Sequence, residues 1–154
     1  VIYIFNFFGK ILLGDGGAYL ISFIAGIILI KFSNDNYLVS PYYIIALLWY
    51  PAYENLFSII RKKILKKSPS TPDNEHLHQL IFLYFNKSFN IDKNLSNLLS
   101  GIIICLYNLL FFFIIFDWYF FTATLVYSVL LNVFIYNLLY FFLKIRLINN
   151  NQNG

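Results

Sequence analysis

Long blocks of apolar residues alternate with short polar segments along this chain of 154 residues. Four of these blocks are long enough to cross a bilayer as helices, since a span needs roughly 20 apolar residues. They cover about 14–32, 41–60, 98–116 and 119–143. The first block is about 28 Å long as a helix, close to the ~30 Å hydrocarbon core, which places Gly14 and Asp15 at the membrane boundary. The pattern predicts an all-α, polytopic transmembrane helix bundle that forms a single membrane domain.

Composition supports a membrane class. Hydrophobic residues make up 60% of the chain and charged residues only 12%, against about 25% charged residues in soluble domains. The single cysteine, Cys105, lies in an apolar block and excludes a disulfide framework. The net charge of +4 is explained by membrane topology, so we expect no nucleic-acid partner.

The basic residues fix the orientation of the predicted spans. With four spans, Lys31 alone falls on one side, and ten of the 11 basic residues fall on the other. These ten are Lys10, Arg61, Lys62, Lys63, Lys66, Lys67, Lys87, Lys93, Lys144 and Arg146. Under the positive-inside rule their side is cytoplasmic.

A cytoplasmic loop over residues 61–97 joins the second and third spans. Ser68–Pro72 cannot continue a helix, and Thr71 with Pro72 makes a favourable start for a new one. We expect an amphipathic helix there, lying against the membrane face or the bundle. Its apolar stripe is predicted to comprise Leu77, Leu80, Ile81, Tyr84 and Phe85.

Asp15 stands within Gly14–Ala18, where the first span begins. One interpretation is a helix N-cap, since a carboxylate there accepts hydrogen bonds from unpaired backbone N–H groups. The other is a Mg²⁺ ligand, because Mg²⁺ binds one or two carboxylates together with phosphates, and the neighbouring glycines allow a phosphate to approach closely.

His76, His78 and Gln79 form a second candidate. In a regular helix residues two apart point about 200° apart, so the histidines share a ligand only if the backbone is irregular near Leu77. His76 and Gln79, three apart, can share a face. The alternatives are two solvated histidines, or a pair that holds a phosphate oxygen or moves a proton.

Two further features lie in and after the second span. Pro51 removes the donor that would bind the carbonyl of Leu47, which predicts a kink, and Glu54 at that depth needs a polar partner or cavity. The basic cluster Arg61–Lys67 is typical of topology and anionic-lipid contact, with attraction of an anionic substrate as the alternative.

Taken in order, these motifs resemble one family, the polyprenyl-phosphate N-acetylhexosamine-1-phosphate transferases. The matching stretches are Phe5–Tyr19, Tyr50–Pro51 with Glu54–Lys62, and Ser68–Leu80. The resemblance covers roughly residues 5–85, and the last two spans fit by hydropathy alone. Gln79 stands where many members have a further histidine.

The resemblance implies a reaction and its residues. A polyprenyl (undecaprenyl) phosphate attacks the β-phosphate of a UDP-N-acetylhexosamine and releases UMP, in the synthesis of cell-envelope polysaccharide precursors at the cytoplasmic face of a bacterial inner membrane. Asp15 matches a catalytic, Mg²⁺-binding aspartate, with Mn²⁺ as an alternative ion. His76, His78 and Arg61 are the expected substrate-binding residues.

The family also carries a paired-aspartate motif and an Asn/Asp-rich motif that are not present here. Val1–Phe8 reads as the tail of a helix whose beginning is missing. We therefore expect a C-terminal fragment or split gene product, inactive without an N-terminal half. The alternative is a non-enzymatic membrane subunit, such as a scaffold or transporter component; polar residues within the spans would serve it, or would act as hydrogen bonds between helices.

Overall fold

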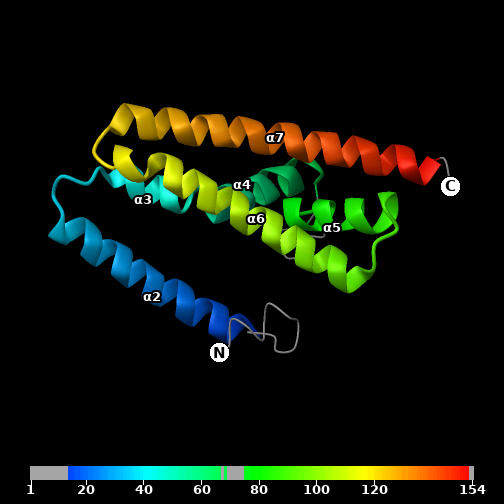
Figure 1. Ribbon diagram of the computed structural model, residues 1–154, viewed down its shortest axis with the longest axis horizontal. Helices are drawn as coiled ribbons and strands as arrows, with labels where there is room; N and C mark the ends of the chain where they lie inside the picture. Colours follow the sequence, from blue (N-terminus) through cyan, green and yellow to red (C-terminus); the bar gives the residue numbers. More distant parts are fainter. Residues whose placement is uncertain (1–13, 67, 69–74, 153–154) are drawn as a thin grey trace.

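A computed structural model describes residues 14–66, 68 and 75–152 (Figure 1). The described residues form helices and no strand, which confirms the all-α prediction. In chain order the elements are α2 (Gly14–Asp35), α3 (Pro41–Leu47), α4 (Trp49–Ile64), α5 (Leu77–Ser88), α6 (Lys93–Ile115), the 3₁₀ turn η1 (Phe116–Trp118) and α7 (Thr122–Gln152).

Within the described part of the chain, two helical segments are each long and apolar enough to cross a membrane, namely Lys93–Trp118 and Thr122–Asn149. They contain the third and fourth predicted spans almost entirely. Figure 1 shows α6 and α7 running antiparallel, joined by the tight η1 turn at one end of the molecule. A membrane hairpin at this place agrees with the predicted short turn at Asp117 and Trp118.

The second predicted span, residues 41–60, is broken rather than merely kinked. α3 and α4 are bent by 70° at Leu48, and together they qualify as one broken span or a re-entrant segment. Pro51 lies in the first turn of α4 and has no N–H for the carbonyl of Leu47, which accounts for the position of the break. The helix after the break continues to Ile64, through the first residues of the predicted loop.

α2 spans 22 residues, about 33 Å at the α-helical rise. It extends away from the other helices in Figure 1 and meets the rest of the bundle at α3. Its apolar side chains are exposed, with Tyr19 at 74%, Phe23 at 67% and Ile28 at 60%. Such a surface is typical of contact with lipid or other helices. Whether residues 14–32 cross the membrane stays a prediction.

The core of the bundle is largely aromatic. Trp49 of α4 is 2% exposed and packs edge-on against Tyr107 and Phe111 of α6. One turn further along α4, the rings of Tyr53 and of Tyr136 in α7 lie 5.0 Å apart at their centroids. Edge-to-face pairs of this kind contribute about 0.5–1.5 kcal/mol each beyond their buried area.

Polar residues inside the spans join one helix to another. Asn137 donates to the Tyr53 hydroxyl at 2.6 Å, and the Tyr107 hydroxyl donates to Asn132. At the opposite end of the bundle from α5, Ser40 and Thr122 share a hydrogen bond of 2.8 Å. In a bilayer, where helices gain little from burying apolar surface against each other, such bonds help to hold the bundle together.

The amphipathic helix begins later than predicted. Glu75 and His76 are non-helical, and α5 starts at Leu77, so the predicted N-cap at Thr71 is wrong; residues 69–74 themselves lie outside the described part. The apolar stripe is confirmed: Leu77, Leu80 and Ile81 are buried against α6 and α7, and Tyr84 and Phe85 pack at their edge. α5 therefore lies against the bundle.

Candidate functional site

Glu54 is a buried carboxylate that contacts the candidate site residue His76. It projects from α4, is 8% exposed, and reaches the start of α5. Its Oε1 atom accepts the backbone N–H of Leu77 at 3.0 Å and lies 3.0 Å from Nδ1 of His76. The carboxylate thus caps the positive end of α5 and holds the His76 ring, and the expectation of a polar partner for Glu54 is confirmed.

The start of α5 is fixed from its own side as well. His76 is the N-cap residue, with extended backbone angles (φ −71°, ψ 153°), and its N–H donates to Oε1 of Gln79 at 3.0 Å. The backbone N–H of Gln79 in turn donates to the His76 side chain, so the two residues form a capping box. Gln79 therefore stabilises the start of α5, at the position where many members of the resembled family have a histidine.

The irregular backbone at this cap brings the two histidines together. Because His76 lies just outside α5 and His78 inside it, their rings are stacked with centroids 5.7 Å apart and planes 10° from parallel. A regular helix would have separated them by about 200°. The sequence analysis required an irregular backbone near Leu77 for the two histidines to share a ligand. The non-helical cap at His76 meets this requirement.

His78 also lines a cavity of about 310 Å³ between α4, α5 and α6. The other lining residues include Tyr50, Asn97, Ser100 and Cys105. Burial lowers the pKa of His78, with the His76 ring adding to the effect and the Glu54 carboxylate opposing it. His78 is therefore neutral at pH 7, since its pKa falls below an ordinary value that is already under 7.

Arg61 of α4 holds the segment that precedes His76. It is 9% exposed, and its Nη1 donates to the carbonyl of Glu75 at 2.7 Å and to the Tyr140 hydroxyl at 2.8 Å. Its guanidinium also lies over the rings of Phe57 and Tyr140. These contacts hold the segment before His76 against α4 and α7; binding of substrate by Arg61 stays a prediction.

Glu75 has a second cationic partner from α7. Lys144 Nζ lies 2.7 Å from Oε2 of Glu75, and the Tyr140 hydroxyl donates to the same oxygen at 3.3 Å. The hydrogen bond from Lys144 holds the pKa of Glu75 below its usual range. α7 thus contributes Lys144, which the sequence analysis assigned only to topology, and Tyr140, to which it assigned no role.

Asp15 lies in the first turn of α2, and its side chain is outside the described part of the chain. Figure 1 shows α2 and α6 running in the same direction, which puts the Gly14 end of α2 on the side of the molecule that carries α5. Among the described residues, no group of three or more acidic, histidine or cysteine side chains is arranged so that it could hold a metal ion. Binding of Mg²⁺ by Asp15 stays a prediction.

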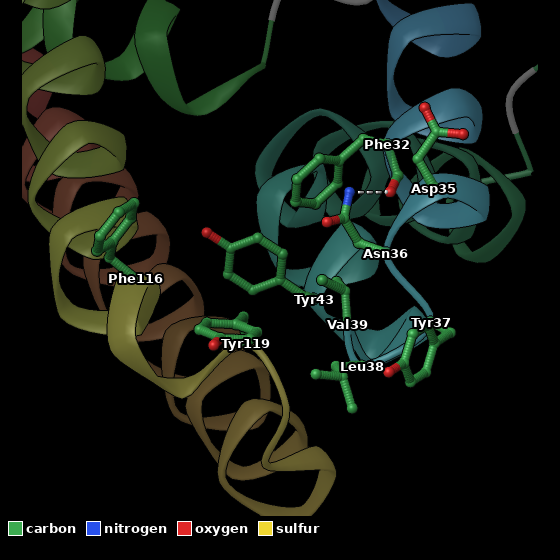
Figure 2. A pocket seen from close by; sticks show the side chains of 9 residues that line it. All are labelled: Phe32, Asp35, Asn36, Tyr37, Leu38, Val39, Tyr43, Phe116 and Tyr119. Carbon is green, nitrogen blue, oxygen red and sulfur yellow. Dashed lines mark hydrogen bonds between the residues drawn. The ribbon is translucent and has the colours of Figure 1, made fainter.

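A second cavity, of about 390 Å³, lies at the opposite end of the bundle. Figure 2 shows its aromatic wall, formed by Tyr43, Phe116 and Tyr119, with the Asp35 carboxylate turned away from these rings. This cavity contains none of the predicted site residues, and Asn36 beside it donates to the carbonyl of Phe32 at 2.8 Å.

Sequence reasoning identified Glu54 and His76 separately and missed their contact, as well as the roles of Glu75, Tyr140 and Lys144. The contact joins residues 22 positions apart and depends on the 70° bend between α3 and α4. The available signal was Glu54 itself, because an ionisable residue within a span needs a partner.

The fold and site define a polytopic helical membrane protein with a buried carboxylate–histidine cluster at one end of its bundle. The chain is 28% identical, over 95 aligned residues, to the undecaprenyl-phosphate alpha-N-acetylglucosaminyl 1-phosphate transferase of Thermotoga maritima. That match covers 53% of this chain and 31% of the relative, so the chain spans about a third of the curated protein it matches. It supports a distant, partial relation to this transferase. No family model and no solved structure matches.

Proposed function

We propose that this chain is part of a membrane enzyme that transfers N-acetylhexosamine 1-phosphate from a UDP-sugar to a polyprenyl phosphate and releases UMP. The observation that carries the proposal is the Glu54–His76–His78 cluster at the end of the bundle where the basic residues gather. These residues lie in the motifs that resemble the transferase family, and the distant relative is such a transferase.

The proposed chemistry requires positioning and charge neutralisation more than covalent catalysis, as phosphoryl transfers generally do. Mg²⁺ would supply charge neutralisation at the diphosphate. Asp15 would hold the ion at the membrane boundary, and His76 and His78 would contact the nucleotide-sugar. The exposed Lys63 and Lys66 beside Arg61 would attract the anionic substrate to the cytoplasmic face of a bacterial inner membrane.

The whole activity requires residues beyond this chain, on the same proposal, because the match covers 31% of the relative. We expect no turnover in membranes that contain this chain alone. Activity is expected when the chain is expressed together with the part of the Thermotoga maritima transferase that lies outside the match. Turnover by the chain alone would contradict the proposal that the active site also requires residues outside this chain.

The test of the catalytic role is Asp15→Asn in that two-part enzyme. We expect it to reduce Mg²⁺-dependent formation of the pyrophosphoryl lipid by about 10³-fold or more, in line with the loss of an important electrostatic group. The matched control is Asp35→Asn at the other end of the same helix, which should retain activity within twofold. Release of UMP from UDP-N-acetylglucosamine is the measurement, and equal rates for the two variants would rule out Asp15.

A further inference from the structure

The cavity of about 390 Å³ lies beside the η1 turn, at the end of the bundle opposite the His76 cluster. Its volume falls in the range of pockets that hold small molecules. Phe116 and Tyr119 form part of its wall and are themselves exposed, so the cavity opens on an apolar face of the protein. Together with Trp118 between them in the sequence, these rings are typical of a membrane–water interface. A ligand that enters from this face therefore comes from the lipids at the membrane boundary.

Tyr43 brings a polar group into this aromatic wall. The residue is 5% exposed and lines the cavity from α3. Figure 2 shows its ring extending into the space between α3 and the segment that carries Phe116 and Tyr119. Within the described part of the chain, the Tyr43 hydroxyl forms no hydrogen bond. Since the hydroxyl of a buried tyrosine normally has a partner, this one indicates a ligand that places an oxygen acceptor between the rings.

The charge at this end of the bundle determines which lipid headgroup suits it. Asp35 is exposed beside the cavity, with its carboxylate turned away from the rings, and Asp117 is exposed within η1. Lys31, one turn before Asp35 on α2, is the basic residue among the described charged groups at this end. The acidic groups outnumber it, so an anionic headgroup would be repelled here. A headgroup that carries an ammonium complements this end.

We propose that the cavity binds one glycerophospholipid of the phosphatidylethanolamine class. Its acyl chain packs against Phe116 and Tyr119, and an ester carbonyl accepts a hydrogen bond from the Tyr43 hydroxyl. The ester groups of such a lipid lie between the headgroups and the hydrocarbon core, at the depth that the neighbouring aromatic residues indicate. The positive-inside rule predicts that this is the outer leaflet. The lipid site is separate from the His76 cluster and does not depend on the proposed function.

Native mass spectrometry of the full chain, released from detergent micelles, tests the site by titration with phospholipids that have the same acyl chains. We expect one phosphatidylethanolamine per chain, bound roughly tenfold or more tightly than phosphatidylglycerol, whose headgroup is anionic. The ether-linked form of phosphatidylethanolamine lacks the ester carbonyls. It should bind about two- to tenfold more weakly than the ester-linked form, which corresponds to the loss of one hydrogen bond.

Tyr43→Phe keeps the ring and removes the hydroxyl. This variant should bind the ester-linked lipid more weakly by the same factor and should bind the ether-linked lipid as the wild type does. The matched control is Tyr42→Phe, because Tyr42 is the neighbouring tyrosine of α3 and is exposed outside the cavity wall. This control should bind both lipids with wild-type affinity.

The wild-type protein alone can overturn the inference. Equal affinity for the ester-linked and ether-linked lipids would exclude the hydrogen bond from Tyr43, even if Tyr43→Phe failed to fold. Equal affinity for phosphatidylethanolamine and phosphatidylglycerol would contradict the headgroup class. A lipid-free dimer would show that a second copy of the chain covers the cavity. Displacement of the lipid on formation of the two-part enzyme would show that the rest of the transferase covers it, and either result would overturn the lipid site.

Discussion

At the scale of single residues, Arg61 shows how a side chain within a basic cluster can serve the fold. Its neighbour Lys63 is exposed, as the usual topology signal requires, but Arg61 is buried between Phe57 and Tyr140. A guanidinium suits this place because it is planar, donates in several directions and stacks on rings. The sequence identifies the cluster, but it does not show that Arg61 folds inward while Lys63 stays exposed.

Replacing Arg61 by alanine should destabilise the protein by about 1–3 kcal/mol, because the Glu75 carbonyl and the Tyr140 hydroxyl both lose their donor. Thermal unfolding in detergent measures the change. The matched control is Lys63→Ala. Because Lys63 is exposed, this substitution should change the free energy of unfolding by no more than about 0.5 kcal/mol. Arg61→Lys should recover only part of the lost stability, since an ammonium group cannot reproduce the guanidinium's hydrogen-bond geometry or its stacking on the rings. Equal stability of Arg61→Ala and Lys63→Ala would contradict the buried role.

The residues of the candidate site were predictable in part. The spacing of His76, His78 and Gln79 gave the right condition for convergence, which the structure meets through the cap at His76. The partner of His76 could not be derived, because sequence periodicity describes neighbours on one helix only. Glu54 and His76 belong to different elements, and their distance depends on where α5 begins.

At the scale of elements, the sequence predicted the long apolar helices. For the second predicted span it also predicted where the helix is interrupted, but not the size of the bend. Pro51 predicts where a backbone hydrogen bond is lost, but not how far the two helices turn. The 70° angle is supported by contacts between residues far apart in the sequence, such as the hydrogen bond between Ser40 and Thr122. The start of α5 was predicted too early because Glu54 and Gln79 favour a cap at His76 over the cap at Thr71.

Substituting Pro51 by alanine tests the cause of the break. Alanine restores a donor for the Leu47 carbonyl and should allow α3 and α4 to straighten. Spin labels at Tyr42 and Ile60, both exposed, would lie about 27 Å apart along a straight helix. We expect a shorter separation with Pro51 present and a shift toward that value in Pro51→Ala, measured by double electron–electron resonance with Cys105 replaced by serine. An unchanged distance would assign the bend to packing against α7 instead of Pro51.

At the scale of the whole molecule, the distribution of charge and the arrangement of helices agree. The described basic residues, with Lys31 as the exception, lie at the end of α4, around α5, at the start of α6 and in the last turns of α7. Since α6 and α7 run antiparallel, these places share one end of the bundle (Figure 1). The aromatic cavity of Figure 2 lies at the other end, beside the η1 turn.

This arrangement makes a topology prediction that decides whether the Mg²⁺ chemistry can occur. In a Cys105→Ser background, Gly16→Cys and Lys63→Cys should react with an impermeant maleimide only after permeabilisation, and Asn36→Cys should react from outside intact cells. Gly16 tolerates the change, because an added Cβ would meet no atom within 4 Å. Lys63 and Asn36 are exposed, so each reports its own side of the membrane. Reaction at position 16 from outside would place Asp15 across the bilayer from the His76 cluster, and one diphosphate could not contact both.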